Sequence, residues 1–265
     1  MRIPVRFGII DWPPVRHSHV SVDYETYYQA RPGVDGDRAA AWRTLSATIK
    51  AGHVMRLCQR AGITHVGSIL EVGCGDGAVL AELHHRGIAD RLAGVEISHT
   101  AASLARNRPE IDVVTTFAGE RLPLADDAYD LVLATHVLEH VGDPARLLSE
   151  MHRVAASVVV VEVPLEANAA GHRPAALRRS VAAGHVQRFD RRAIRQLVDD
   201  TGLARRHELS DPLPRSVRVF QDGTVLGTVK WAARGLLTLS PGRGERWMTV
   251  HYAALASVGE AAARG

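Results

Sequence analysis

A glycine-rich turn between an apolar run and a helical pattern constrains this chain more than any other feature. The run Ile69–Val72 is followed by Gly73, Gly75 and Gly77, and helical periodicity begins directly afterwards. Glycines let the backbone turn tightly and let a ligand touch it without meeting a Cβ atom, and the next helix offers unpaired N–H groups. The segment therefore predicts a strand, a turn and a helix that hold a nucleotide-like cofactor.

Short apolar runs alternate with helical patterns from Ser68 to about Ser157, which is typical of β-α-β units in a parallel sheet. A β-branched run at Val158–Val163 predicts a central strand, and Asp143 and Pro144 predict the start of a helix. The chain is therefore expected to have an α/β fold. In chain order, we expect strands at 69–72, 92–97, 113–116, 131–135, 158–163, 204–209 and 247–256, and helices at 37–61, 77–86, 100–107, 144–154 and 191–201.

The first quarter of the chain has a different pattern. In the expected helix at 37–61, Trp42, Leu45 and Ile49 recur at spacings of three and four residues, which gives the helix one apolar face. We interpret residues 1–67 as an N-terminal lid or cap made of helices.

The rest of the chain, residues 68–265, is expected to form one domain. Two stretches interrupt its pattern of strands and helices. We expect them to be substrate-facing insertions at about 164–190 and 212–246.

Composition excludes several classes of protein. The two cysteines, Cys58 and Cys74, are too few for a disulfide framework or a zinc cluster. Apolar runs stay far below the ~20 residues of a membrane span, and Met1–Trp12 lacks the pattern of a secretory signal. We therefore expect a cytoplasmic protein without a membrane partner, either a monomer or a homodimer.

The basic isoelectric point does not indicate a nucleic-acid partner. The 32 basic residues exceed the 29 acidic ones by only three, and lysine occurs only at Lys50 and Lys230. The isoelectric point of about 9.1 therefore comes from arginine, whose pKa is very high. We expect no nucleic-acid partner.

Two features of the glycine segment also fit a dinucleotide. Residues Gly73 to Ala78 match the pattern G-x-G-x-x-A, and Glu96 stands where a ribose-binding acid belongs in such a unit. On these features alone, the cofactor could be NAD.

Three further features favour a different cofactor. Glu71, two residues before the first glycine, would oppose a pyrophosphate but suits a cofactor that carries an ammonium and a sulfonium group. The second expected strand ends at Glu96-Ile97, and the run Asp130–Val141 ends in V-L-E-H-V. Together with an L-P-x-x-D-x-x-Y-D-L run, these motifs resemble the class I S-adenosylmethionine-dependent methyltransferases, in their small-molecule branch. The resemblance is good over roughly Ser68–Val163 and weak over the C-terminal third.

This resemblance implies a fold and a cofactor. The fold would be Rossmann-like and doubly wound, with a mostly parallel seven-stranded sheet whose last strand is antiparallel, plus the N-terminal helical lid. The cofactor would be S-adenosyl-L-methionine, with S-adenosyl-L-homocysteine as product. The activity would be methylation of a small metabolite, such as one of secondary metabolism, at an O or N acceptor.

The resemblance also assigns the cofactor site. The glycine turn would carry the methionine part, with Glu71 on its amino group, and Glu96 would accept both ribose hydroxyls. Ile97 would pack on the adenine, and Gly119 and Glu120 would recognise its amine, because Ala118 stands where such families often have an acid. The expected cofactor-binding residues are Glu71, Gly73, Cys74, Gly75, Gly77, Glu96, Ile97, Gly119, Glu120, Thr135, His136 and Tyr28.

Several of these residues also have a purely structural interpretation. The Cys74 thiol is expected to fill space in the turn. Tyr24 and Tyr28, one helical turn apart, are either core aromatics or residues that close over the cofactor.

On the acceptor side, histidines are the candidate catalytic residues. A general base is needed when the acceptor is an alcohol, a phenol or a protonated amine, and histidine has a suitable pKa. His185 follows Gly184 in a loop that leaves the carboxyl edge of the sheet, where open α/β sheets bind ligands. We expect His185 to be the base, with His136 and His140 as alternatives.

Arginines cluster in the same region. They indicate either an anionic acceptor or a solvated surface. The arginines are Arg173, Arg178, Arg179, Arg188, Arg191, Arg192 and Arg195.

We expect no metal. The ubiquinone-pathway O-methyltransferases resemble the stretch around Glu139-His140 and use acids and histidine there around a divalent metal, but His136 stands where such a site would need an acid. Three other functions remain open at this point: a non-catalytic cofactor-binding subunit, an NAD-dependent oxidoreductase and an RNA methyltransferase.

Overall fold

The structure is a computed structural model that describes residues 25, 28, 34–238, 245 and 247–259 of the 265 in the sequence. The expectations for Met1–Trp12 and for Tyr24 lie outside the described residues.

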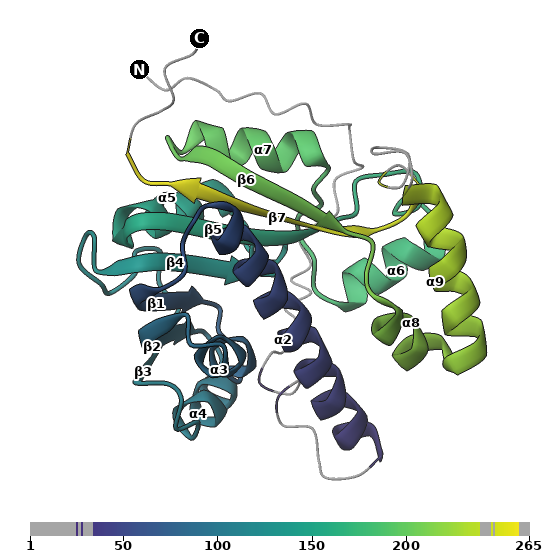
Figure 1. The fold of residues 1–265 in the computed structure, drawn as a ribbon, viewed down its shortest axis with the longest axis horizontal. Helices are drawn as coiled ribbons and strands as arrows, with labels where there is room; N and C mark the ends of the chain where they lie inside the picture. The colour runs from purple at the N-terminus through teal and green to yellow at the C-terminus, as the bar shows by residue number, and fades with distance from the viewer. Residues whose placement is uncertain (1–24, 26–27, 29–33, 239–244, 246, 260–265) are drawn as a thin grey trace.

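Seven strands form one sheet: β1 (Val66–Val72), β2 (Ala89–Glu96), β3 (Val113–Thr116), β4 (Tyr129–Thr135), β5 (Ala155–Leu165), β6 (Ala204–Asp211) and β7 (Val250–Ser257). They lie in the order β3-β2-β1-β4-β5-β7-β6 (Figure 1). The strands β1 to β5 pair in parallel, and β7 is antiparallel to its neighbours β5 and β6. This confirms the predicted Rossmann-like, mostly parallel sheet with an antiparallel last strand.

The described helices are α2 (Val34–Arg60), α3 (Ala78–His85), α4 (His99–Arg106), the short 3-10 helix η1 (Leu138–His140), α5 (Pro144–Val154), α6 (Pro174–Ala182), α7 (Arg191–Asp200), α8 (Arg215–Asp222) and α9 (Thr224–Thr238). Asp143 accepts a hydrogen bond from the backbone N–H of Arg146 at 2.9 Å and so caps α5, as the sequence predicts.

Some elements differ from their predicted bounds. β2 ends at Glu96, and Ile97 lies outside the strand because the chain turns there into the cap of α4. Trp247, which was expected in the last strand, precedes β7 and is exposed. The two insertions contain helices that the sequence patterns do not predict: α6 in the first, and α8 and α9 in the second. All three gather beyond the carboxyl ends of β4 and β5 (Figure 1).

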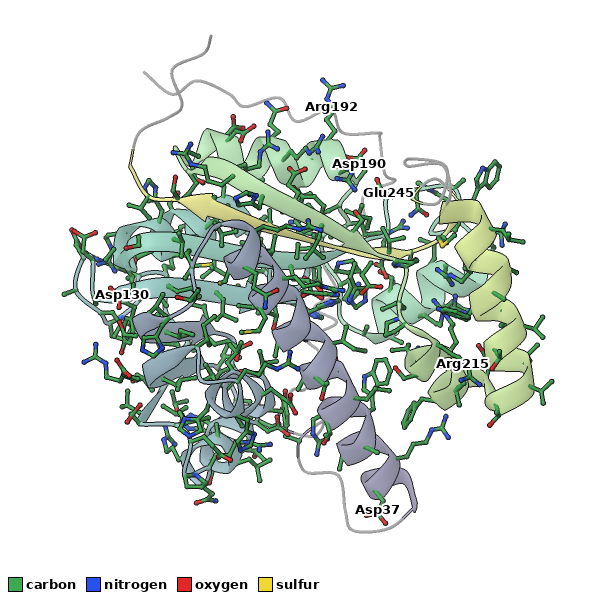
Figure 2. All side chains as sticks on the ribbon, in the orientation of Figure 1. Asp37, Asp130, Asp190, Arg192, Arg215 and Glu245 are labelled. Atoms are coloured by element: carbon green, nitrogen blue, oxygen red, sulfur yellow. The ribbon has the colours of Figure 1, made fainter. Side chains whose placement is uncertain are left out.

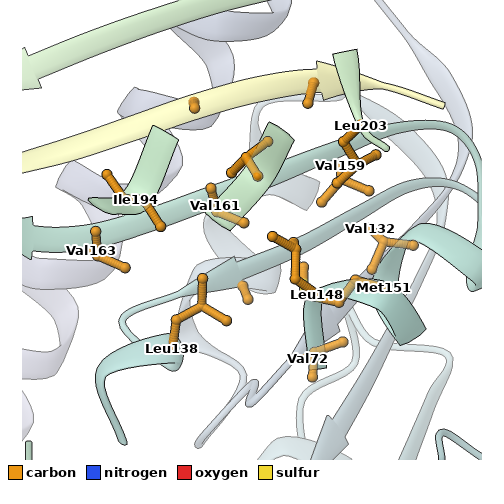
Figure 3. Packing of buried hydrophobic residues seen from close by; sticks show 14 of the residues in the cluster. Val72, Val132, Leu138, Leu148, Met151, Val159, Val161, Val163, Ile194 and Leu203 are labelled. Carbon is orange, nitrogen blue, oxygen red and sulfur yellow. The ribbon is translucent and has the colours of Figure 1, made fainter. Parts of the chain in front are cut away.

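The core has two parts, one on each face of the sheet. Alternate residues of β4 belong to different parts: Leu131 and Leu133 pack with α2, α3 and α4, whereas Val132 packs with α5 and α7. Figure 3 shows the second part, where Leu148 of α5 and Ile194 of α7 meet the sheet. The period-two alternation of strand side chains thus places helices on both faces, as a doubly wound fold requires.

The helix α2 crosses one face of the sheet (Figure 1). Its C-terminal half is buried, with Ala51, Val54 and Leu57 in the same core part as β1. The N-terminal half of α2 is more exposed. The proposed division into a lid at 1–67 and a domain at 68–265 stays a prediction. Among the described helices, none is long and apolar enough to cross a membrane.

Candidate active site

The glycine turn after β1 has the backbone that its sequence predicts. Gly73, Gly75 and Gly77 all have positive φ, at 73°, 55° and 74°. A Cβ atom on Gly75 would lie 2.4 Å from the hydroxyl oxygen of Tyr28, and one on Gly73 would lie 2.5 Å from Val137. Only glycine combines this conformation with so close an approach.

A cavity of about 180 Å³ lies between the glycine turn, α2 and the end of β4. Seven of the predicted cofactor residues line it, namely Tyr28, Glu71, Gly73, Cys74, Gly75, Thr135 and His136. Residues that the sequence reasoning did not assign to a site also line it, among them Trp42, Arg43, Ser46, Lys50 and Asp76. The cavity is therefore built jointly by the predicted turn and by the helix that precedes the sheet.

Glu71 is the buried acid of this cavity. Its Oε1 accepts a hydrogen bond from Thr135 Oγ1 at 2.9 Å, and its Oε2 is buried without a hydrogen-bond partner among the described residues. Burial raises the pKa of Glu71 to about 8, although Lys50 and the Thr135 bond act in the opposite direction. Such a carboxyl suits a ligand that brings its own positive charge.

Two cations of α2 reach the same cavity. Lys50 Nζ donates to the backbone oxygen of Thr135 at 3.4 Å, and Arg43 Nε pairs with Asp76 Oδ2 at 2.9 Å. Lys50 shares a helix face with Ala47 and Val54, which are buried. A lysine on the apolar face of an amphipathic helix is the sequence signal that could have found it.

Hydrogen bonds of the Glu96 carboxylate connect the glycine turn to the end of β2. Its Oε2 accepts from the backbone N–H of Gly75 at 2.7 Å, and its Oε1 accepts from the N–H groups of Ile97 and Ser98, both at 2.9 Å. Glu96 thus shapes the turn, besides the ribose-binding role that the resemblance implies for it.

The residues expected around the adenine lie outside the cavity. Ile97 is 56% exposed, and Glu120 forms an ion pair with Arg146 at 2.7 Å. The ring of Phe117 covers Gly119. Their predicted contacts with adenine stay predictions.

Cys74 behaves as a packing residue. Its sulfur lies against Gly94, where a Cβ atom would come within 2.4 Å of it. Burial raises the pKa of the Cys74 thiol far above its usual range. The thiol is therefore protonated and fills space in the turn.

His136 stands directly after β4, at the end of the cavity. Its φ of 61° is in the left-handed region, which is costly for a residue with a side chain. Its Nδ1 lies 3.0 Å from Glu139 Oε1, and its Nε2 lies 3.3 Å from Glu162 Oε1. The backbone and two carboxylates thus fix the direction of this imidazole.

His140 and His185 form a second group beside Glu139. His185 Nδ1 lies 2.8 Å from Glu166 Oε2, and Ser180 Oγ donates to the same oxygen at 2.7 Å. The ring centroids of His140 and His185 are 4.8 Å apart. Backbone N–H groups that follow His185 donate to the carbonyl oxygen of Glu139, so the first insertion is tied to η1. All three predicted histidines therefore lie at the carboxyl edge of the sheet.

Part of the arginine cluster is already neutralised. Arg191 pairs with Glu245, which lies beside Asp190 at the start of α7 (Figure 2), and Arg195 pairs with Glu208. A hollow of about 530 Å³ along α7 is larger than the cavity; three arginines of the cluster, Arg191, Arg192 and Arg195, line it, but none of the predicted cofactor-binding or catalytic residues does. The chemistry therefore concentrates in the smaller cavity.

Comparison with known proteins agrees with this geometry. Residues 42–208 match the family model described as a methyltransferase domain. A probable S-adenosylmethionine-dependent methyltransferase of Mycobacterium tuberculosis is 34% identical over 101 residues, which are 36% of this chain and 35% of that protein. A ubiquinone biosynthesis O-methyltransferase of Photobacterium profundum is 31% identical over 124 residues, which are 43% of this chain and 52% of that protein. The chain thus matches a third to a half of the length of these relatives.

Among solved structures, the geranyl diphosphate C-methyltransferase of Streptomyces coelicolor has a TM-score of 0.56 at 16% identity. The likeness covers 80% of this chain and 77% of that one. That structure contains Mg²⁺, geranyl diphosphate and S-adenosyl-L-homocysteine.

The family model spans more than half of the chain, begins within α2 and ends in β6, and includes every residue that lines the cavity except Tyr28. The family favours a methyl donor over NAD as the ligand of this cavity. The chain belongs to the methyltransferase domain family.

Proposed function

We propose that this enzyme transfers the methyl group of S-adenosylmethionine to an oxygen or nitrogen atom of a small-molecule acceptor. The observation that carries the proposal is the pair of His185 and Glu166. Because Nδ1 of His185 is bonded to Glu166 Oε2 at 2.8 Å, its Nε2 is left as the proton acceptor. A positioned imidazole is what an acceptor with a removable proton requires.

In this proposal, the donor lies in the cavity. Its ammonium group binds Oε2 of Glu71, which has no hydrogen-bond partner among the described residues, and its methionine part follows Gly73 and Gly75 beneath Tyr28. Glu96 takes the ribose hydroxyls. On the adenine side, the contacts are the predicted ones with Ile97, Gly119 and Glu120.

The chain's own residues then align the reaction. Methyl transfer is an in-line displacement at a sulfonium carbon, so the protein mainly positions the nucleophile and excludes water. His185 accepts the proton of the acceptor. Despite burial, bonds from His185 and Ser180 lower the pKa of Glu166, so Glu166 stays ionised and stabilises the imidazolium that forms.

Relatives support a small acceptor. One relative is named for ubiquinone biosynthesis, and one solved neighbour holds geranyl diphosphate. Arg191 and Arg195 are paired with carboxylates, so we assign neither to an anionic acceptor.

The test is methyl transfer from labelled S-adenosylmethionine to pools of phenols, carboxylic acids, amines and RNA. We expect label in a small phenolic, hydroxylic or amine compound. Label in RNA alone would contradict the proposal and would favour the RNA methyltransferase alternative.

Once an acceptor is identified, His185→Ala should lower the transfer rate by about 10²–10⁴-fold and leave cofactor affinity nearly unchanged. His65→Ala is the matched control, because His65 precedes β1 at the opposite edge of the sheet. Wild-type rates in both variants would remove His185 from the reaction.

A further inference from the structure

Three atoms that could bind a metal ion, each from a different strand region, form a triangle beside the cavity. They are Nε2 of His136 after β4, Oε1 of Glu162 in β5 and Nδ1 of His251 in β7. The two nitrogens are 3.2 Å apart, and they lie 3.3 Å and 3.0 Å from the carboxylate oxygen. The backbone pairing of β4, β5 and β7 brings these residues together, and the N–H of His136 donates to the carbonyl oxygen of Glu162 at 2.9 Å.

Hydrogen bonds alone satisfy this triangle poorly. If both facing nitrogens carry protons, two N–H groups crowd one carboxylate oxygen and each other. If either nitrogen lacks its proton, its lone pair lies against a carboxylate oxygen. A cation at the centre attracts all three atoms at once.

The size of the triangle fits a metal ion. Bonds of about 2.0–2.1 Å to imidazole and carboxylate place the ligand atoms of a tetrahedral ion about 3.3–3.4 Å apart, and those of an octahedral ion about 2.8–3.0 Å apart. The three observed separations lie between 3.0 and 3.3 Å. Two imidazoles and one carboxylate on one face of an ion favour first-row transition metals over Mg²⁺ or Ca²⁺ and leave positions open for a substrate.

A second layer of residues holds the three ligands. Glu139 Oε1 lies 3.0 Å from the other ring nitrogen of His136. His53 Nδ1 lies 2.9 Å from the second oxygen of Glu162, and Asp211 lies 2.9 Å from His53 Nε2. Metal-binding histidines and carboxylates are typically oriented in this way by outer partners.

Two of the three side chains are partly exposed to solvent. Glu162 is buried, but the side chains of His136 and His251 are 18% and 17% exposed. His136 also lines the cofactor cavity. Open positions of an ion at this place would therefore lie next to the cavity that His136 lines.

We propose that His136, Glu162 and His251 bind one divalent transition-metal ion, and that this ion takes an oxygen of the acceptor. The role for the acceptor rests on the proposed function. The acceptor hydroxyl loses its proton to His185 and binds the ion as an oxyanion. Its oxygen then forms a bond to the methyl carbon while the carbon–sulfur bond breaks, and that electron pair stays on the sulfur of S-adenosylhomocysteine.

The test measures metal binding without any acceptor. The full-length protein is freed of metal with a chelator and titrated with Co²⁺, followed by visible absorption, and with Zn²⁺ and Mg²⁺ by calorimetry. We expect one equivalent of Co²⁺ that Zn²⁺ displaces and Mg²⁺ does not. Absence of stoichiometric Co²⁺ binding would overturn the site.

Variants locate the ion. Glu162→Gln and His251→Ala should abolish Co²⁺ binding, and His53→Ala should weaken it by roughly 10–100-fold. His185→Ala should leave it unchanged, which separates this site from the group of Glu139, His140 and His185, whose ligand atoms also lie within 4.8 Å of one another. If Co²⁺ still binds to the Glu162→Gln and His251→Ala variants but no longer binds to His185→Ala, the proposal is overturned.

Two measurements test the metal site separately from the proposed function. Calorimetric binding of S-adenosylhomocysteine to each variant shows that it is folded, because this ligand is expected on Glu71 and the glycine turn. Metal binding is scored without an acceptor, so failure to find a small acceptor would refute the proposed function and not the site. Full methyl transfer in the metal-free protein would refute the ion's role toward the acceptor.

Discussion

At the residue scale, the protonation of Glu71 links cofactor binding to pH. The carboxyl has a pKa of about 8 without ligand, because burial outweighs Lys50, while Glu96 and Asp76 raise the pKa further. An ammonium group at Oε2 favours the ionised form, so the pKa in the complex is lower. At pH values between the pKa of free Glu71 and its lower pKa in the complex, ligand binding releases the proton of Glu71, so the affinity rises with pH. We expect the affinity for S-adenosylhomocysteine to increase by up to about tenfold per pH unit from pH 6 toward 8.

Calorimetry in buffers of different ionisation enthalpy measures both the affinity and the proton release. Glu71→Gln is the matched control, because the amide has no proton to lose and the ligand's own amine titrates equally in both proteins. A variant with the same pH slope as the wild type would show that Glu71 does not face the ammonium group.

Glu96 gives a second prediction at this scale. Glu96→Ala removes the acceptor of three backbone N–H groups as well as the expected ribose contacts. We expect the free energy of unfolding to fall by about 1–3 kcal/mol without ligand, and S-adenosylhomocysteine affinity to fall roughly tenfold to a hundredfold. Urea unfolding and calorimetry check the two effects separately. Unchanged affinity with reduced stability would leave Glu96 only its structural role.

At the scale of elements, the N-terminal segment offers a test of the lid. Two described residues of this segment contact the rest of the chain: the Tyr28 hydroxyl lies against Gly75 in the glycine turn, and Glu25 accepts from the N–H groups of His99 and Thr100 at the start of α4, at 2.5 Å and 2.9 Å. Deletion of residues 1–33 leaves α2 whole, so the sheet should stay folded, whereas turnover should be lost. Circular dichroism and labelled-methyl transfer measure the two outcomes. Full activity of the truncated protein would contradict the lid.

Local patterns explain why most elements could be predicted. The central strands β1, β4 and β5 are continuous buried runs, as expected for strands covered on both faces of a parallel sheet, and the glycines mark the turn after β1. The helices α8 and α9 lack such a signal, because α9 contains β-branched residues and glycine, which lower helix propensity. The two helices form because they pack on each other. Gly227 of α9 lies so close to α8 that a Cβ atom at this position would come within 2.4 Å of the backbone oxygen of Arg218.

The same limit applies to the site. Residues within the turn and after β4 could be predicted because they are neighbours in sequence. Glu162 and His251 could not, since they come together with His136 only through the pairing of β5 with β4 and β7. Sequence spacing therefore predicts the cofactor side of the site better than the acceptor side.

At the scale of the whole molecule, the cavity joins parts that are distant in the chain. Its walls come from α2, from the turn after β1 and from the end of β4, and α2 also contacts α3, α8, β6 and β7. A ligand in such a cavity binds the folded state and has no equivalent site in the unfolded chain. Cofactor binding must then stabilise the entire fold rather than one segment.

We expect S-adenosylhomocysteine at a hundred times its dissociation constant to add about 2.7 kcal/mol to the free energy of unfolding. For a domain of this size, each kcal/mol raises Tm by roughly 2–4 °C, so the shift should be about 5–11 °C. Differential scanning fluorimetry measures it, with NAD at the same concentration as the control ligand. NAD should have no effect, because Glu71 opposes a pyrophosphate at the glycine turn. With Glu71→Ala, the shift at the same ligand concentration should shrink, since the ammonium contact is gone. A wild-type shift with NAD and none with S-adenosylhomocysteine would contradict the assignment of the cavity to the methyl donor.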